Sequence, residues 1–346
     1  MKRILIYIVK LTASGTLALI FLSVFCFFYD NAPIVVEQPL EITNYRYRAH
    51  TTWFDMTEGF GWGKTNNLGY NDQYDFDNCL DPVIVFLGSS HTEAFQMTQE
   101  KTCVSKLQER LFSDDNKNND FPCLNLGVSG HDFEISASNL EYVAEYFDKA
   151  KYVVIEAREL LYSPEEFQKI LDGKYHDPLK KDGKISEILE KYPVLRNPFL
   201  RTLKKQYDRV ERIQEASKQL VPPLNVDYIE YKAELAPVLE TLSSISKEYG
   251  FQIIIVYHHQ LKIDDEYGLI KTDDSECVQI FSETCKQNGI EFIDISDVYI
   301  SNYNSNYGVP YGFANTAAGE GHMNALGHSI MAEVLYNNIC VLEKEK

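Results

Sequence analysis

The hydrophobic residues of the chain form one long apolar run at the N-terminus and a series of shorter runs further on. Residues 4–28 contain a single charge, Lys10, and residues 11–28 contain none. A run of this length is sufficient to cross the hydrocarbon core of a bilayer. Because Lys2 and Arg3 precede it, we expect the rest of the chain on the extracytoplasmic (periplasmic or extracellular) side of a membrane. No pair of small residues typical of a cleavage site follows the run, which favours an uncleaved anchor over a signal peptide; both interpretations stay open.

Short apolar runs beyond this segment alternate with segments of helical periodicity. The runs have the length and the β-branched content of buried strands. They are residues 82–87, 121–126, 152–157, 252–257 and 292–295. The helical segments include 93–112, 135–147, 235–249, 275–288 and a last one at about 324–342. Buried strands separated by amphipathic helices predict a parallel sheet covered on both faces, which is a three-layer α/β sandwich.

The same pattern predicts the organisation of the chain. We expect a cytoplasmic stub and transmembrane anchor over residues 1–30, a linker over 31–44 and one domain over 45–346. A helical insertion at about 160–238 interrupts the alternation within that domain. It carries a dense basic stretch between residues 196 and 212, which is either a lid for an anionic substrate or membrane surface, or a solvated helix face balanced by nearby acids.

Charge and cysteine content narrow the range of partners. The formal net charge of −18 gives a surface that repels phosphate backbones, so we expect no nucleic-acid partner. Six of the seven cysteines lie beyond the anchor, which permits disulfides; Cys79 and Cys123 are the best single pair, and six reduced thiols are the equal alternative. Cysteines and histidines do not occur at zinc spacing, so we expect no metal and no other cofactor.

Candidate chemistry lies where the predicted strands end, because open parallel sheets bind ligands beyond the carboxyl ends of their strands. The first strand runs into Gly88, Ser89 and Ser90, and the last helix is preceded by a loop that contains His322. A serine in a tight turn between strand and helix exposes its hydroxyl, and its backbone N–H lies near a positive helix end. Since that hydroxyl is a weak nucleophile at neutral pH, Ser90 needs a base, and His322 is the candidate.

Three short blocks of the sequence resemble those of SGNH/GDSL hydrolases. Residues 83–92 are similar to the first block, a strand followed by Gly-Asp-Ser, and residues 125–130 to the second. Residues 322–328 are similar to the last, in which His is followed by Asn and a Gly-His pair. Order and spacing agree over about residues 65–340. The resemblance implies a flavodoxin-like sandwich and a serine-dependent esterase or acyltransferase.

Roles follow from the resemblance residue by residue. Ser90 would attack an ester carbonyl, His322 would act as the base, and the N–H groups of Ser90 and Gly130 would hold the oxyanion. Asn324 would shape the loop of His322. We expect three residues to contact the substrate, although His258 is also explained as a polar loop residue: His91, His258 and Asn324.

The sequence departs from the family pattern at three positions. Arg158 stands where the family has the oxyanion-hole Asn, so we expect it to stabilise the oxyanion or hold a substrate carboxylate; an ion pair with a nearby Glu is the alternative. Gly319 stands at the acid position, and Glu320 is the candidate replacement unless a Ser-His dyad operates. Ser89 replaces the usual Asp, which predicts a less charged turn.

The leading hypothesis is hydrolysis or transfer of a small acyl group, above all acetyl, on an acylated cell-envelope glycan. The glycan is implied by the resemblance alone. The second hypothesis is a catalytically inactive binding or assembly protein of the envelope with the same fold, which the missing Asn and Asp support. A lipase that acts on bilayer lipids is a third.

Overall fold

The computed structural model describes residues 2–31, 33, 35–37, 45–76, 83–113, 121–158, 160, 163–173, 199, 202, 228–259, 261–264, 266–271 and 276–344. Its centre is a parallel sheet of five strands in the order β12-β9-β8-β6-β7. These strands are β6 (Val83–Leu87), β7 (Cys123–Asn125), β8 (Ala150–Ala157), β9 (Gln252–Tyr257) and β12 (Glu291–Asp294). This is the strand order of flavodoxin-like folds, so the predicted fold class is confirmed.

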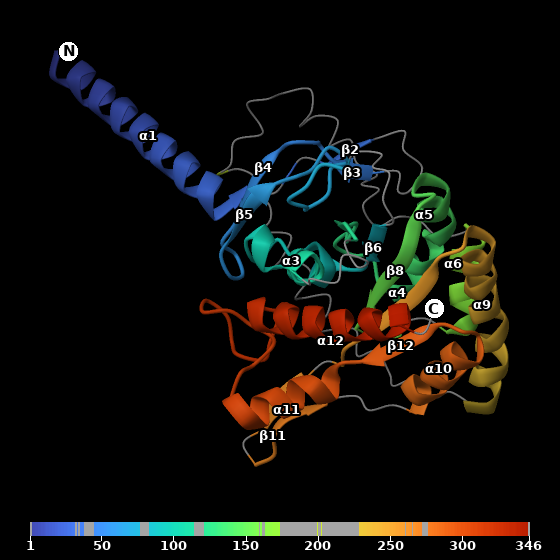
Figure 1. Ribbon diagram of the computed structural model, residues 1–346. Coiled ribbons are helices and arrows are strands. Elements are labelled where there is room, and N and C mark those ends of the chain that lie inside the picture. Colours follow the sequence, from blue (N-terminus) through green and yellow to red (C-terminus); the bar gives the residue numbers. More distant parts are fainter. Residues whose placement is uncertain are drawn as a thin grey trace.

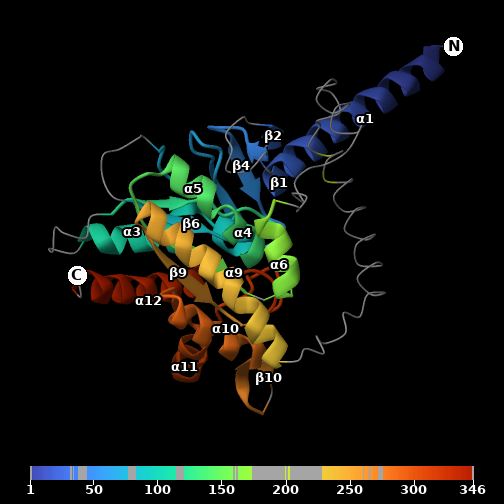
Figure 2. The ribbon, with the colours of Figure 1, turned by 90° about the vertical axis from the view of Figure 1, so that its right-hand side faces the viewer.

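Helices cover both faces of the sheet (Figures 1 and 2). One face is covered by α3 (Cys103–Ser113), α11 (Ser296–Asn306) and α12 (Ala325–Lys344). The other is covered by α4 (Phe133–Ser138), α5 (Leu140–Tyr146), α6 (Pro164–Leu171), α9 (Tyr228–Tyr249) and α10 (Glu276–Gln287). Shorter elements complete the described part of the domain: α2 (Ser90–Glu93), a 3-10 turn at Gln99–Lys101, and a hairpin of β10 (Leu261–Asp264) and β11 (Gly268–Lys271).

Alternation along the strands explains why the sequence shows continuous apolar runs. In β6, Val83, Val85 and Leu87 pack in one hydrophobic cluster, whereas Ile84 and Phe86 pack in the cluster on the opposite face. Successive side chains of a strand point to opposite faces, so a strand covered on both sides must be apolar throughout. The two clusters together fix the sheet and hence the loops at its carboxyl edge.

The N-terminal helix α1 (Lys2–Tyr29) extends away from the domain and is joined to it by a small antiparallel sheet (Figure 1). That sheet has the order β1-β4-β5, with β1 (Asp30–Asn31), β4 (Thr52–Asp55) and β5 (Gly61–Lys64). The rings of Phe27 and Phe28 pack against Phe54 of β4. Helix α1 is long and apolar enough to cross a membrane. A signal sequence shares these two properties.

The predicted linker contributes more than a spacer. Its residues Val35–Glu37 form β2, which pairs antiparallel with β3 (Tyr45–Tyr47), and Asn31 pairs with Phe54. Two successive β-branched valines favour the extended backbone that this pairing needs.

Two other expectations fall largely outside the described residues. The predicted insertion begins with α6 and ends within α9, but the basic residues between 196 and 212 are not described. Cys79 is also outside the described ranges, and the other six cysteines are free thiols.

Candidate active site

The candidate site lies at the carboxyl edge of the sheet, at the point where the strand order reverses. Strand β6 has β7 on one side and β8 on the other, and ligands of such sheets bind at this switch point. Ser90 begins α2, and only Gly88 and the N-cap residue Ser89 separate it from β6. A pocket of about 200 Å³ opens here, and it is lined by Ser89, Ser90, His91, Gly130, Asp132, Phe133, Glu156 and Arg158.

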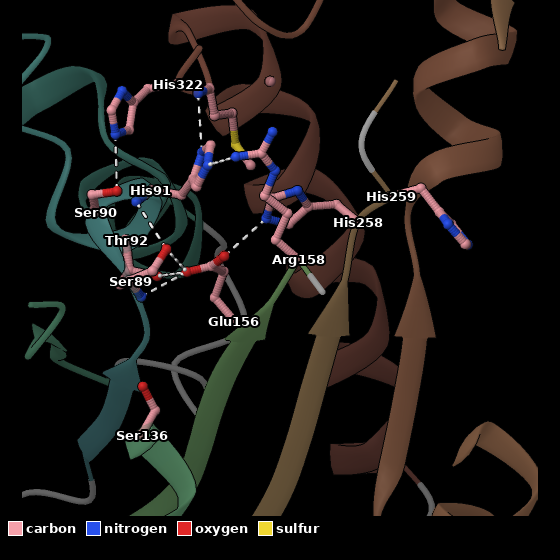
Figure 3. A network of polar contacts seen from close by, with 12 residues as sticks. Ser89, Ser90, His91, Thr92, Ser136, Glu156, Arg158, His258, His259 and His322 are labelled. Carbon is pink, nitrogen blue, oxygen red and sulfur yellow. Dashed lines mark hydrogen bonds and ion pairs between the residues drawn. The ribbon is translucent and has the colours of Figure 1, made fainter. Parts of the chain in front are cut away.

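The structure brings Ser90 and His322 together across 232 positions of sequence (Figure 3). The Ser90 Oγ and His322 Nε2 atoms are 2.8 Å apart. The other ring nitrogen, Nδ1, lies 2.5 Å from Oε2 of Glu58. A carboxylate only accepts hydrogen bonds, so Nδ1 carries the proton and Nε2 is left to accept the proton of the Ser90 hydroxyl. Hydroxyl, imidazole and carboxylate thus stand in the order that general-base activation of a serine requires.

The carboxylate that orients His322 is Glu58, and the expectation for Glu320 is corrected. Glu58 lies in the turn between β4 and β5, and its Oε1 also accepts the backbone N–H of His322 at 2.6 Å. Glu320 is exposed, and its backbone N–H donates to Ala317 O. The physical reason is the turn at Gly319 and Gly321, where positive φ angles of 84° and 80° direct the loop toward the β4–β5 hairpin.

Local hydrogen bonds hold the turn that carries Glu58. Oδ1 of Asp55 accepts from the backbone N–H of Thr57 at 2.8 Å and from its hydroxyl at 2.6 Å. Asn315, in the loop before His322, accepts from the Gly59 N–H at 2.7 Å and donates to Met56 O at 3.0 Å. The hairpin and the His322 loop are therefore fixed to each other beside the hydrogen bond between His322 and Glu58.

Gly321 leaves the space that Glu58 occupies. A Cβ atom at this position would lie 2.2 Å from Glu58 Oε1. We expect Gly321→Ala to displace the carboxylate and to lower kcat by about 100-fold, as misplacement of an active-site group by about 1 Å does. Kinetics on an aryl acetate would measure this. The control is Gly289→Ala, which has a similar φ of 72° but nothing within 4 Å of the added atom; equal losses in the two variants would contradict the role given to Gly321.

Glu156, near the end of β8, places its carboxylate against the turn between β6 and α2 that carries Ser90. Its Oε2 accepts from the Ser89 N–H at 2.8 Å, the Ser89 hydroxyl at 2.9 Å and the Thr92 hydroxyl at 3.2 Å, and its Oε1 lies 3.0 Å from His258 Nε2. Burial alone would raise the pKa of Glu156, but the hydrogen bond and charge of His258 hold it well below its usual range. The turn is therefore charged although Ser89 replaces an Asp, which corrects the expectation of a less charged turn.

Two residues expected to contact the substrate lie outside the pocket. His258 is fully buried between Glu156 and Tyr311, whose hydroxyl lies 2.6 Å from His258 Nδ1. Asn324 caps α12: its Oδ1 accepts from two backbone N–H groups of that helix, and its Nδ2 donates to Val309 O and Gly312 O. Both side chains have their hydrogen-bonding capacity used within the fold, so their roles are structural. His91 does line the pocket.

The expected oxyanion donors lie at the pocket as well. Gly130 has a φ of 88° in the turn after β7, and both Gly130 and Ser90 line the pocket. Within the described ranges, no hydrogen-bond acceptor faces the backbone N–H of either residue. An oxyanion hole needs unpaired amides of this kind at the pocket.

Glu93 of α2 is buried next to the turn that follows β7, where it accepts hydrogen bonds from the N–H and the hydroxyl of Ser129. Burial raises the pKa of Glu93 from 4.5 to about 7, against the opposing effect of the Ser129 hydrogen bonds. Between those values the unfolded chain releases a proton that the folded chain keeps, so rising pH destabilises the fold by roughly 3 kcal/mol at most from this group. We expect the melting temperature of Glu93→Gln to rise relative to that of the wild type as the pH increases from 4.5 to 7.5. Asp72, whose pKa burial raises to about 7, and His91 and His328, whose pKa values burial lowers, add pH dependences of opposite sign that both proteins share; equal slopes in the two proteins would contradict the assignment.

Glu58 is the main site residue that sequence reasoning missed. It directly precedes a glycine- and aromatic-rich stretch, 59–63, that predicts turns and carries no family block. Its only local signal is a lone acid flanked by turn-forming residues. Within the ranges that the structure describes, no group of three or more His, Cys, Asp or Glu side chains is arranged to hold a metal ion.

Neither a protein-family model nor a curated protein sequence matches the chain. Solved structures do. A two-domain esterase active on acetylated mannans matches with 10% identity and a TM-score of 0.40 over 76% of this chain and 50% of its own. An acetyl xylan esterase from Geobacillus stearothermophilus matches with 14% identity and a TM-score of 0.37 over 75% of this chain and 94% of its own. A GDSL-like lipase from Parabacteroides merdae matches with 14% identity and a TM-score of 0.35 over 73% and 93%. The solved structures to which this chain is similar in fold thus include GDSL-type hydrolases and acetyl xylan esterases.

Proposed function

We propose that the chain is a serine esterase or acyltransferase of the SGNH/GDSL kind, with Ser90 as nucleophile, His322 as general base and Glu58 as the group that orients His322. The observation that carries the proposal is the continuous hydrogen-bonded path from Ser90 Oγ through both ring nitrogens of His322 to Glu58. The Ser90 Oγ atom bonds to the ester carbonyl carbon as its proton passes to His322 Nε2, and the N–H groups of Ser90 and Gly130 stabilise the oxyanion. The alcohol then leaves with that proton.

Pocket size favours a small acyl group. A volume of about 200 Å³ accommodates an acetyl ester and part of one sugar ring rather than a long acyl chain. The fold relatives described above as acting on acetylated mannans and xylan agree in kind with an acetylated glycan as substrate. Hydrolysis and transfer share the acyl-enzyme and differ in whether water or a sugar hydroxyl accepts the acyl group.

A catalytically inactive binding protein is the weaker alternative. The absence of the family's acid supported it, but Glu58 supplies a carboxylate to His322. A direct assay separates the functions: the purified chain, in detergent, is supplied with aryl acetate, butyrate and palmitate. An acetylesterase releases acid fastest from the acetate, a lipase prefers the palmitate, and a binding protein turns over none of them. Added methyl glycoside that captures acetyl at the expense of free acetate would identify a transferase.

We also propose that α1 is a retained membrane anchor with the catalytic domain outside the cytoplasm. Lys2, Arg3 and Lys10 on its N-terminal side favour this orientation. The packing of Phe27 and Phe28 on Phe54, and the hydrogen bond from Met56 N–H to Tyr29 O at 2.8 Å, tie the helix to the hairpin that carries Glu58. Cleavage after the apolar run would remove these contacts, so they favour an uncleaved anchor over a signal peptide.

A further inference from the structure

The feature that the proposed reaction leaves unexplained is a pair of hydrogen-bond donors that face each other at the pocket wall. The backbone N–H of Met323 donates to Nδ1 of His91 at 3.1 Å. Burial lowers the pKa of His91 well below its usual range, so the ring is neutral and its single proton sits on Nε2. Nε2 lies 3.3 Å from Nη1 of Arg158, which also only donates (Figure 3). Two donors in contact without an acceptor are unfavourable. A negatively charged oxygen that accepts a hydrogen bond from both would relieve this.

Arg158 has the charge for such an acceptor and no carboxylate partner in the described part of the chain. No ion pair of Arg158 occurs among the described residues, and its buried Nε has no hydrogen-bond partner. Glu156, two residues earlier in the chain, has both oxygens engaged by Ser89, Thr92 and His258. A half-buried guanidinium without a counter-ion is costly unless a ligand supplies one.

The position of the pair indicates which anion it binds. His91 lies between the reacting groups and Arg158, since its ring is 5.1 Å from that of His322 while its Nε2 faces the guanidinium. The oxyanion forms on the carbon attached to Ser90, where the amides of Ser90 and Gly130 are available. The Arg158–His91 pair is thus free to hold a second, permanent negative charge further along the substrate.

We propose that Arg158 and the Nε2–H of His91 form a subsite for a substrate carboxylate next to the scissile ester, so that the preferred substrate is an acylated acidic sugar. The inference rests on the proposed esterase function and adds the substrate class. It also reconciles an acidic substrate with a net charge of −18, because the attraction is local and desolvated rather than a property of the whole surface.

Kinetics on matched substrates test the subsite. We expect kcat/KM to be about 10- to 100-fold higher for an acetylated methyl glucuronoside than for the equally acetylated methyl glucoside, which is the effect of one charge-assisted contact. Arg158→Gln should abolish that preference, so that the two glycosides are hydrolysed with similar kcat/KM. An aryl hemisuccinate compared with the aryl butyrate tests a carboxylate on the acyl side; a preference for the hemisuccinate and none for the glucuronoside would contradict a carboxylate on the sugar. Equal wild-type rates on the two glycosides would overturn the proposal, as would an equal fall in kcat on both in Arg158→Gln, which would assign Arg158 to the oxyanion.

Binding without turnover separates this proposal from the esterase function. Calorimetric titration of the Ser90→Ala protein with methyl glucuronoside should show binding that methyl glucoside does not show and that the additional change Arg158→Gln removes. If the chain hydrolyses no ester but this selective binding is present, the subsite stands and the esterase proposal fails. If esters are hydrolysed but the glucuronoside binds no better than the glucoside, the subsite is wrong.

Discussion

Ser90→Ala is expected to lower kcat on an aryl acetate by about 10⁶-fold, because it removes the atom that forms the acyl-enzyme. The hydroxyl lies at the pocket, where it is 2.8 Å from His322 Nε2, and it is not packed within the hydrophobic core. We therefore expect the melting temperature of the variant to stay within about a degree of the wild type. Stopped-time product assays at high enzyme concentration would measure the residual rate.

Ser89→Ala is the matched control for this prediction. Ser89 caps α2, its hydroxyl accepts the N–H of His91 and donates to Glu156, and it has no contact with His322 among the described residues. Its loss should reduce stability by about 1 kcal/mol while much of the activity remains. A Ser90→Ala protein that keeps wild-type turnover, or a larger kinetic loss in Ser89→Ala than in Ser90→Ala, would contradict Ser90 as nucleophile.

Glu58→Gln is expected to lower kcat by about 10³- to 10⁴-fold with little change in KM, whereas Glu320→Gln leaves both constants unchanged. Without the carboxylate, His322 is not held in the tautomer that leaves Nε2 free to accept the Ser90 proton, and the imidazolium that forms is not stabilised. Glu58 touches His322 rather than the pocket, so its effect should fall on kcat and not on substrate binding.

Glu58→Asp serves as the conservative control. It keeps the charge on a shorter side chain and should recover part of the activity lost in Glu58→Gln, which a purely structural role for the hairpin would not predict. Loss of activity in Glu320→Gln but not in Glu58→Gln would contradict this assignment. Wild-type rates in both variants would indicate a dyad of Ser90 and His322.

The sheet was predictable from the sequence because its strands are buried on both faces and therefore read as unbroken apolar runs. Val83–Leu87 and Gln252–Tyr257 are such strands, and both expected runs lie within a residue of the observed bounds. The turn that carries Ser90 was also predictable, because a strand, a glycine and a helix in succession leave little freedom for where Ser90 points. The small sheet at the end of α1 was not predicted, because its strands of two to four residues have no clear periodicity.

Side-chain partnerships across the fold were much less predictable. Glu58 meets His322 only because two loops, 264 positions apart, pack together. His258 was expected near the substrate because it ends a strand, but the carboxylate of Glu156 on the neighbouring strand draws it into the core. Asn324 was expected at the pocket because it follows His322. Its side-chain oxygen instead caps α12, and its side-chain nitrogen donates to Val309 O. In each case the position along the chain was right, and the partner that decides the role lay on another element.

Activity-based labelling shows whether Ser90 is a nucleophile that His322 activates. The full-length chain in detergent is incubated with a fluorophosphonate probe, digested and analysed by mass spectrometry. We expect one adduct, on Ser90, that is absent in Ser90→Ala and forms much more slowly in His322→Ala and Glu58→Gln. Folded protein that takes up no probe at Ser90, or that is labelled equally fast when His322 is replaced, would contradict a serine activated by that imidazole.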